Sequence, residues 1–322
     1  MNQHSPLRTA SLIERAAELY GFAPAAAPPA KPEPKVQPQP EVVRAPQPQP
    51  RPQAEAARKP DAEPARAPRP LAVRAAAPAA RTVRIERARL RAAALIEPEA
   101  PVGALAEEFR IVKRQLLLNL RAATELPEAK RRSILVCSAQ PDDGKTFCAL
   151  NLALSLAGEK DLEVLLVDAD FPKPEILSTL GVESAGGLVD ALADPSRDPE
   201  DLVLATDVKG LSLLPAGRPV DNVTELLASE RTQRVLARLA EANPRRIILF
   251  DSPPALMASP ATALAGHAGQ LLMVVRADKT TEGELREALD LLSGCERVSL
   301  VLNGTGLAAG GRRFGAYYGY GT

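Results

Sequence analysis

Residues that can bind phosphate and metal ions follow the first strong apolar run of this sequence. The run 134–137 precedes a polar turn, 140–144, and then Lys145 and Thr146 open an apolar-periodic helical pattern. Backbone N–H groups in such a turn and at a helix N-terminus can surround a phosphate. The Lys145 ammonium can reach terminal phosphates, and the Thr146 hydroxyl can bind Mg²⁺. Strand, turn, Gly-Lys-Thr and helix are the context that a P-loop requires.

This turn departs from the usual P-loop pattern in two ways. Ala139 stands where the first glycine of the pattern belongs, and Asp142 and Asp143 place carboxylates beside the expected phosphate. Carboxylates repel phosphate, so we expect both to point to solvent or toward a cation. The alternative is an ordinary strand-to-helix turn that happens to contain Gly-Lys-Thr. The predicted nucleotide-binding residues are Gln140, Pro141, Asp142, Asp143, Gly144, Lys145, Thr146 and Phe147.

Three aspartates end two other apolar runs. Asp251 closes the run 246–251, as a Walker B aspartate does, and Asp168 and Asp170 close the run 163–167. Carboxylates at the C-terminal ends of parallel strands can hold Mg²⁺, and one can accept the proton of an attacking hydroxyl. For a single Asp the ordinary interpretation is a helix N-cap, but three in this order favour a nucleotide site. The predicted catalytic residues are Lys145, Asp168, Asp170 and Asp251, and the predicted Mg²⁺ ligands are Thr146, Asp168 and Asp251.

The chain has four tyrosines, and three of them, Tyr317, Tyr318 and Tyr320, lie in its last six residues among glycines. Glycine-rich chain does not pack as an element, so this segment, 309–322, is expected to be a flexible tail. A tethered tail can enter an active site at high effective concentration, in its own subunit or a neighbouring one. The tyrosine hydroxyls are then candidate acceptors for a phosphoryl group. A sticky tail and an end without a role are the alternatives.

The elements that must position these groups alternate along the chain. Continuous aliphatic strands alternating with helices predict an α/β fold with a mostly parallel sheet covered by helices on both faces, similar to P-loop NTPases. The expected strands are 134–137, 163–167, 211–215, 246–251, 271–275 and 298–302. The expected helices are 104–120, 147–156, 224–242 and 282–292, and 83–96 reads as a short strand or helix.

The N-terminal quarter has a different composition. Residues 11–21 read as a short amphipathic helix with a capping box of Ser11 and Glu14, and residues 23–82 are rich in Pro and Ala with no aromatic residue. A segment of that composition buries too little apolar area to fold, so we expect a disordered linker. The predicted organisation is a helix in 1–22, a linker in 23–82, the catalytic domain in 83–308 and a tail in 309–322.

Composition narrows the function further. Lys+Arg and Asp+Glu balance at 40 each, which gives no electrostatic reason to expect nucleic acid binding. Three cysteines lie in or beside apolar runs, which favours small core residues over a disulfide framework or a metal site. No apolar run approaches the roughly 18 residues that span a bilayer. We therefore expect a cytoplasmic protein that meets the membrane only through a partner.

Taken together, these motifs resemble the bacterial tyrosine kinases of capsule and exopolysaccharide synthesis. The matching stretches are 139–146, the Asp-x-Asp strand 165–170 with Lys173 after it, the strand and Asp-Ser-Pro-Pro of 247–254, and the tyrosine tail. The resemblance implies ATP and Mg²⁺ as cofactors and autophosphorylation of Tyr317, Tyr318 and Tyr320. The start of the chain, the linker and residues 108–114 look closer to the branch found beside exosortase (PEP-CTERM) polysaccharide loci.

The resemblance also implies partners. The family's E-x-x-R-x-x-R oligomerisation helix is matched by Glu107, Arg110 and Lys113, with Lys in place of the last Arg. A homo-oligomer is therefore expected, with a ring as one arrangement. Without the family, these three residues read as a solvated helix face with local ion pairs. Family members are activated by the cytoplasmic end of a membrane co-polymerase that regulates chain length, and a cognate tyrosine phosphatase opposes them.

Two other functions remain open at the level of sequence. A MinD/ParA-type ATPase shares the fold and the Asp-x-Asp strand, but its signature lysine would stand at Gln140, and it needs no tyrosine tail. A nucleotide-binding scaffold without catalysis is the third possibility, because of Ala139, Asp142 and Asp143. In the kinase hypothesis Asp168 or Asp170 takes the tyrosine proton, and Lys173 either neutralises the moving phosphoryl group or pairs with an acidic neighbour. Phosphorylated tails should repel one another and favour disassembly.

Overall fold

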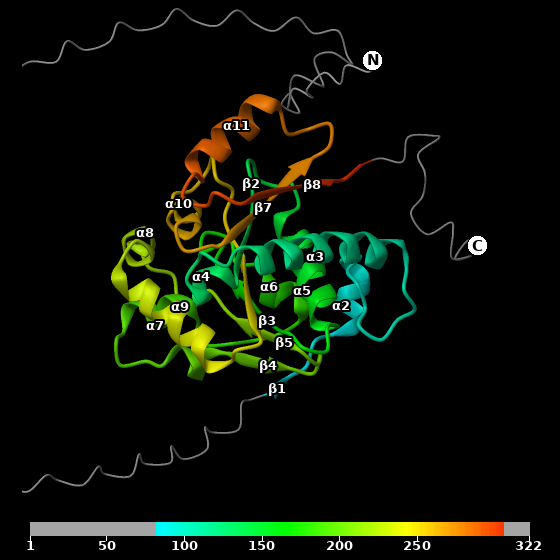
Figure 1. Ribbon diagram of the computed structural model, residues 1–322. Coiled ribbons are helices and arrows are strands. Elements are labelled where there is room, and N and C mark those ends of the chain that lie inside the picture. Colours follow the sequence, from blue (N-terminus) through cyan, green and yellow to red (C-terminus); the bar gives the residue numbers. More distant parts are fainter. Residues whose placement is uncertain (1–81, 306–322) are drawn as a thin grey trace, which may run out of the picture. The chain divides into compact units, whose positions relative to one another are not determined.

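The structure is a computed structural model, and it describes residues 82–305 (Figure 1). The predicted N-terminal helix, most of the linker and the tyrosine tail lie outside the described residues. Within them, eight strands form one sheet in the order β1-β4-β5-β3-β6-β2-β7-β8. Every strand pair is parallel except β4 with β5. The predicted α/β class with a mostly parallel sheet is confirmed.

The strands are β1 (Thr82–Val83), β2 (Ser133–Ser138), β3 (Glu163–Asp168), β4 (Leu204–Thr206), β5 (Leu211–Leu214), β6 (Arg246–Asp251), β7 (Gln270–Arg276) and β8 (Val298–Asn303). The helices are α2 (Arg87–Ala92), α3 (Ala104–Ala122), α4 (Glu128–Arg131), α5 (Lys145–Ala157), α6 (Ile176–Leu180), α7 (Leu188–Ala193), α8 (Val223–Leu227), α9 (Glu230–Ala242), α10 (Pro260–Ala265) and α11 (Glu282–Leu291), with a 3₁₀ turn at Pro199–Leu202.

Six of these strands coincide with the predicted ones to within two residues, because each is a continuous aliphatic run. The expected helix 224–242 is wrong: the chain forms α8 and α9 instead. Ser229 has extended backbone (φ −81°, ψ 157°) and begins a new helix, while its hydroxyl donates to the Leu226 carbonyl at 2.6 Å. The Thr232 hydroxyl donates to the same carbonyl at 2.8 Å, so two side chains bind the last turn of α8 where the chain turns into α9.

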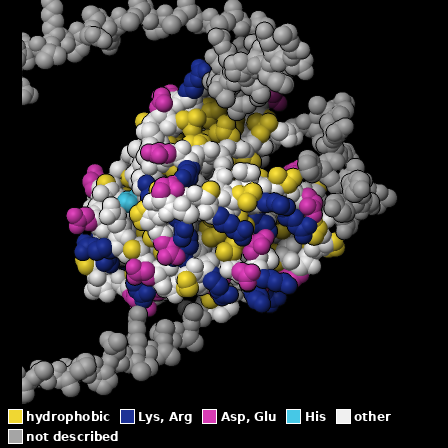
Figure 2. All heavy atoms as spheres, in the orientation of Figure 1, with side chains coloured by type: hydrophobic (Ala, Val, Ile, Leu, Met, Phe, Trp, Pro, Cys, Tyr) yellow, Lys and Arg dark blue, Asp and Glu magenta, His cyan; other side chains and the backbone are white. Residues whose placement is uncertain are grey.

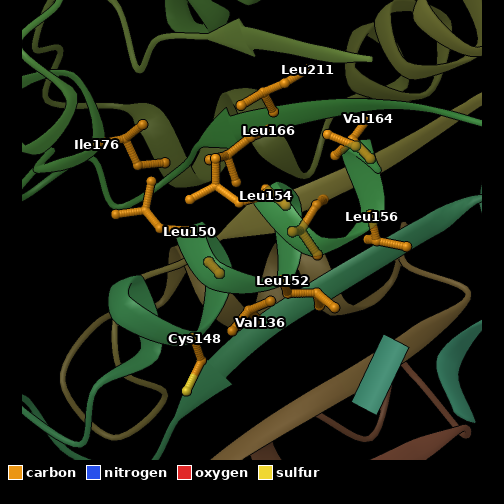
Figure 3. Close-up of a cluster of buried hydrophobic side chains, with 14 of the residues drawn as sticks. Val136, Cys148, Leu150, Leu152, Leu154, Leu156, Val164, Leu166, Ile176 and Leu211 are labelled. Carbon is orange, nitrogen blue, oxygen red and sulfur yellow. The ribbon is translucent and has the colours of Figure 1, made fainter. Parts of the chain in front are cut away.

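Two hydrophobic clusters cover the two faces of the sheet. One joins alternate strand residues to α2, α3, α5 and α6, and the other joins the remaining strand residues to α7, α8, α9, α10 and α11. Figure 3 shows the first cluster, in which leucines of α5 lie against Val136 of β2 and Leu166 of β3. All three cysteines are buried and free, which confirms their prediction as core residues. The central strands are thus held rigidly between two helical layers.

No helix among residues 82–305 is long and apolar enough to cross a membrane.

Candidate functional site

The strand register places two of the predicted aspartates side by side. Asp168 and Asp251 are register partners at the ends of the adjacent strands β3 and β6, and β6 also pairs with β2, which leads into the predicted P-loop. All three strands run parallel, so their C-terminal ends lie at one edge of the sheet. The topology therefore brings together the Lys145 loop and the two carboxylate strands, as the sequence predicted.

The turn between β2 and α5 has the backbone geometry of an anion cradle. Gly144 adopts φ +94° and Asp142 adopts φ +62°, both in the left-handed region. Turns that alternate in this way point successive N–H groups to one side and form an anion-binding nest. Lys145 begins α5 directly after Gly144, so the helix N-terminus adds its partial positive charge. Ala139 is fully buried in the core, which explains why a small apolar residue serves at this position.

The two aspartates of the turn behave differently. Asp142 is exposed, as predicted. The expectation for Asp143 is wrong: its side chain is fully buried, and its Oδ2 accepts the Gln140 N–H at 3.1 Å. Asp143 therefore binds the loop's own backbone and fixes its first half. Its Oδ1 has no hydrogen-bond partner within the described structure.

Lys145 lies at the centre of the site. Its Nζ is 2.6 Å from Asp170 Oδ2 and 3.4 Å from Thr146 Oγ1, and its side chain is 12% exposed. Burial lowers the pKa of Lys145, but the Asp251 and Asp170 carboxylates outweigh it and hold the pKa above its usual value. The ammonium is therefore charged and held at the mouth of the phosphate cradle.

Asp168 and Asp251 lie deeper. Burial raises the pKa of each to about 7, while the Ile176 N–H lowers that of Asp168 and the Lys145 ammonium lowers that of Asp251. Asp168 Oδ2 accepts the Ile176 N–H at 3.2 Å. Three carboxylate oxygens, Asp168 Oδ1 and both of Asp251, are buried without a hydrogen-bond partner in residues 82–305. Buried unpartnered carboxylates are strongly unfavourable, so these oxygens are suited to a cation.

A cleft of about 480 Å³ opens beside Lys145, Thr146 and Asp170. It is lined by the cradle residues Pro141, Asp142, Gly144, Lys145, Thr146 and Phe147, by Asp170, Pro172, Lys173 and Glu175 after β3, and by Pro253, Pro254, Met257 and Ala258 after β6. Lys173 is exposed and its Nζ pairs with Glu175 Oε1 at 2.9 Å. Of the two interpretations of Lys173, the structure shows the acidic pairing.

The sequence did not indicate a set of contacts through which β8, α11 and the segment between β7 and α11 hold the P-loop. Asn303, the last residue of β8, donates from Nδ2 to the Asp143 carbonyl at 2.9 Å. Lys279 Nζ donates to the Pro141 carbonyl at 3.0 Å, and Gln140 Nε2 donates to Glu284 Oε1 at 3.0 Å. Asn303 could have been found by the rule that found the aspartates, because it also ends a parallel strand.

The predicted oligomerisation residues are not all on an exposed face. Glu107 and Arg110 form an ion pair on α3. Lys113 instead turns inward: its Nζ donates to the Ser155 carbonyl at 2.9 Å and pairs with Glu159 Oε1 at 2.7 Å, and its side chain is 12% exposed. The expectation of an exposed Lys113 is therefore wrong, because the C-terminal end of α5 attracts its charge.

Comparison with known proteins shows which proteins this chain resembles in sequence and fold. No family model matches the chain. It is 29% identical over 210 residues to the tyrosine-protein kinase YwqD of Bacillus subtilis, which covers 65% of this chain and 84% of that protein. It is 30% identical over 209 residues to the tyrosine-protein kinase Wzc of Salmonella typhimurium, covering 64% of this chain but only 28% of that protein. The solved BceF tyrosine kinase domain superposes with a TM-score of 0.51 at 31% identity, over 61% of this chain and 76% of that domain.

Fold and site together define a P-loop α/β protein with Asp-x-Asp and Walker B strands beside the phosphate cradle. Within that class, the chain belongs to the bacterial tyrosine kinases.

Proposed function

We propose that the chain is an ATP-dependent protein-tyrosine kinase that phosphorylates Tyr317, Tyr318 and Tyr320 of its own tail, mainly between subunits. The observation that carries this proposal is the Lys145–Asp170 pair, 2.6 Å long, at a phosphate cradle whose neighbouring strands end in unpartnered carboxylates. Its relatives are named tyrosine-protein kinases, and the tail supplies hydroxyl groups that a plain ATPase does not need.

The residues of the cleft fit a nucleotide with Mg²⁺. The three unpartnered oxygens of Asp168 and Asp251 are hard ligands of the kind that Mg²⁺ prefers, and the Thr146 hydroxyl adds a fourth oxygen. The described residues contain no group of three or more His, Cys, Asp or Glu that forms a metal cluster by itself. That fits a cation held by one or two carboxylates and by substrate phosphates. Bound there, Mg²⁺ would supply charge neutralisation of the phosphates.

The geometry also divides the roles of the two Asp-x-Asp residues. Asp170 lines the cleft and is bound to Lys145, whereas Asp168 is not among the lining residues. When the Lys145 ammonium binds the β/γ-phosphates, the Asp170 carboxylate is released into the cleft. We assign Asp170 as the acceptor of the tyrosine proton, and Asp168 with Asp251 and Thr146 as the metal ligands.

The test is incubation of the purified chain with Mg-ATP followed by intact-protein and peptide mass spectrometry. We expect phosphate on the C-terminal peptide of the wild type and none on Lys145→Met. The matched control is Lys160→Met, because Lys160 is exposed near the opposite end of α5. Phosphorylation of the tail in Lys145→Met at the wild-type rate would contradict the assignment of Lys145 to the nucleotide site. ADP formation without phosphotyrosine would instead indicate a positioning ATPase.

We extend the proposal to the biological setting of the relatives. The tail, by this hypothesis, is phosphorylated in an oligomer whose contacts include Glu107 and Arg110, and a membrane co-polymerase that regulates chain length activates the kinase from the cytoplasmic side. A cognate tyrosine phosphatase reverses the reaction. The branch beside exosortase loci is the proposed subgroup. Activation is testable by adding the cytoplasmic segment of a co-polymerase from the same locus to the labelling reaction.

A further inference from the structure

The outer face of β8 is apolar and uncovered. Val298, Leu300 and Leu302 alternate along this edge strand with 42%, 58% and 59% of their surface exposed. Their register partners on β7 are Leu271 and Met273, which belong to the core cluster that includes α10 and α11, and Val275, which packs against that cluster. Strands of a parallel sheet are normally buried on both faces. The helices on this side of the sheet therefore cover β7 but leave β8 uncovered. We call the exposed side chains of Val298, Leu300 and Leu302 the β8 face.

The opposite face of the same strand is covered. Ser299 Oγ accepts from Asn119 Nδ2 of α3 at 3.2 Å, and Val301 packs against the core cluster that contains Leu116 of α3. Figure 2 shows hydrophobic side chains gathered beside α11, over the end of the sheet where β7 and β8 lie. Only the α11 side of β8 lacks a covering element within residues 82–305. A large exposed apolar strip of this kind usually marks a binding surface.

The chain itself supplies a candidate to cover this strip. The described residues end at Thr305, three residues after Leu302, and the sequence continues for 17 residues that include Phe314, Tyr317, Tyr318 and Tyr320. These four rings are two-fifths of the ten Phe and Tyr residues of the whole chain. Aromatic rings bury large apolar areas while a hydroxyl stays at the surface. The tail therefore carries large apolar rings of the kind that would cover the exposed aliphatic side chains of the β8 face.

The tail has the length and the turns to reach that face. The β8 face extends over about 14 Å, since residues in a strand rise by about 3.4 Å each. Eight residues separate Thr305 from Phe314, and a chain of that length has a reach of about 14–17 Å, by the usual square-root dependence on length. Reversal of direction is favoured at Gly304, which already has φ +66°, and glycines follow at 306, 310 and 311. A tether this short gives millimolar effective concentration.

We propose that the β8 face is the resting dock of the chain's own tail, where the aromatic rings of residues 314–320 cover Val298, Leu300 and Leu302. The proposal rests on the proposed function, in which the same tyrosines are the phosphate acceptors. Docking withholds them from the catalytic cleft. Each phosphate adds a charge of about −1.5 to −2, which is unfavourable against an aliphatic face. A phosphorylated tail therefore leaves the dock and does not return until the phosphate is removed.

Limited proteolysis of the full chain without nucleotide tests the dock. Chymotrypsin cleaves after the Phe and Tyr residues of 314–320 themselves, so the rate of release of the C-terminal peptide reports the undocked fraction. We expect the double variant Leu300→Gln/Leu302→Gln to release this peptide about tenfold faster than the wild type, because cleavage follows the population of the open form. The control Ile111→Gln/Leu118→Gln changes two leucine-sized residues of α3 that are each 50% exposed, and it should match the wild type. Equal rates for the β8 variant and the wild type would overturn the proposal.

Hydrogen exchange identifies the occupant. We compare residues 298–303 in the full chain and in a chain that ends after Thr305. The docking proposal predicts that the amides of residues 298–303 exchange faster in the shorter chain than in the full chain. It also predicts that the exchange rate of each chain is the same at low and high protein concentration. Equal exchange in both chains, or protection that grows with concentration, assigns the β8 face to another segment or to a second copy and overturns the proposal.

Neither measurement uses ATP, so failure of the dock and failure of the kinase assignment are distinct. A tail that is labelled by Mg-ATP but cleaved equally fast in all variants contradicts only the dock. A tail that is protected by the β8 face but never labelled supports the dock and contradicts the kinase assignment.

Discussion

Strands β6 and β8 are six residues long and run parallel in the same sheet, yet they depart from ordinary burial in opposite ways. β6 is buried throughout and ends in Asp251, whose two carboxylate oxygens have no partner among the described residues. β8 alternates between exposed and half-buried residues and exposes three aliphatic side chains. Buried polar groups and exposed apolar strips are the informative exceptions to the burial rule. The first needs a cation, and the second needs an apolar cover.

Replacement of Asp251 should have the largest effect. Asp251→Asn removes the charge that the metal requires but keeps the shape, so we expect tail labelling to fall by at least about 100-fold, more than the 10–100-fold typical of changes one shell farther from a metal. The measurement is the initial rate of phosphotyrosine formation at saturating Mg-ATP. Asp161→Asn is the control, because Asp161 is exposed and precedes the N-terminal end of β3, away from the site. A loss of less than threefold would contradict the role of Asp251 in the site.

The same substitution should change the pH dependence of stability. Burial raises the pKa of Asp251 from 3.8 to about 7, so the folded protein holds a proton that the unfolded chain releases. The free energy of unfolding therefore carries a contribution from Asp251 that is present below pH 4, decreases as the pH rises and is lost above pH 7. Asn has no such dependence. In urea denaturation without Mg²⁺, Asp251→Asn should gain stability relative to the wild type between pH 4 and 7, and a constant difference would contradict the burial of the charge.

The next effect concerns the backbone of the cradle. Gly144→Ala forces a residue with a Cβ to φ +94°, and that Cβ would overlap the Asn303 amide. The left-handed conformation alone costs about 1–2 kcal/mol, so we expect lower stability and a large loss of ATP affinity, measured by denaturation and calorimetry. Gly283→Ala is the matched control, because Gly283 lies in α11 with nothing within 4 Å of a new Cβ. That change should stabilise by up to about 1 kcal/mol.

A smaller effect connects the two regions. Asn303 ends β8 and binds the Asp143 carbonyl, so Asn303→Ala leaves that carbonyl without its donor. Loss of one hydrogen bond costs about 1 kcal/mol, and we expect it to appear as a several-fold rise in KM for ATP. Asn119→Ala removes the 3.2 Å bond to Ser299 on the same strand but far from the loop, and it should leave KM unchanged. Equal changes of KM in both variants would mean that Asn303 acts only through the stability of β8.

The sequence predicted what depends on local pattern. Continuous aliphatic runs predicted six strands, and the order of Gly-Lys-Thr and the terminal aspartates predicted that Lys145, Asp168 and Asp251 meet at one edge of the sheet. It missed β4, which is three residues long and lacks a buried run, and it expected one short strand or helix in 83–96, where the chain forms β1 at the edge of that range and then α2. It could not place Asp143 or Lys113, because the partners of these charges, the Gln140 amide and the end of α5, are defined only by the folded backbone.

The smallest effect tests the edge strand itself. Met273 and Leu300 are register partners on one face of the sheet, but Met273 is fully buried and Leu300 is 58% exposed. Met273→Ala should destabilise by about 2–5 kcal/mol because it opens a cavity. Leu300→Gln in a chain ending after Thr305 should change stability by no more than about 0.5 kcal/mol, as surface substitutions do. In the full chain the same change also loses the contact with the tail, so its larger effect there, measured by urea denaturation of the two lengths, gives the strength of docking. If Leu300→Gln changed the stability of both lengths equally, the tail would not cover the β8 face. That result would contradict the conclusion that β8 needs an apolar cover where β6 needs a cation.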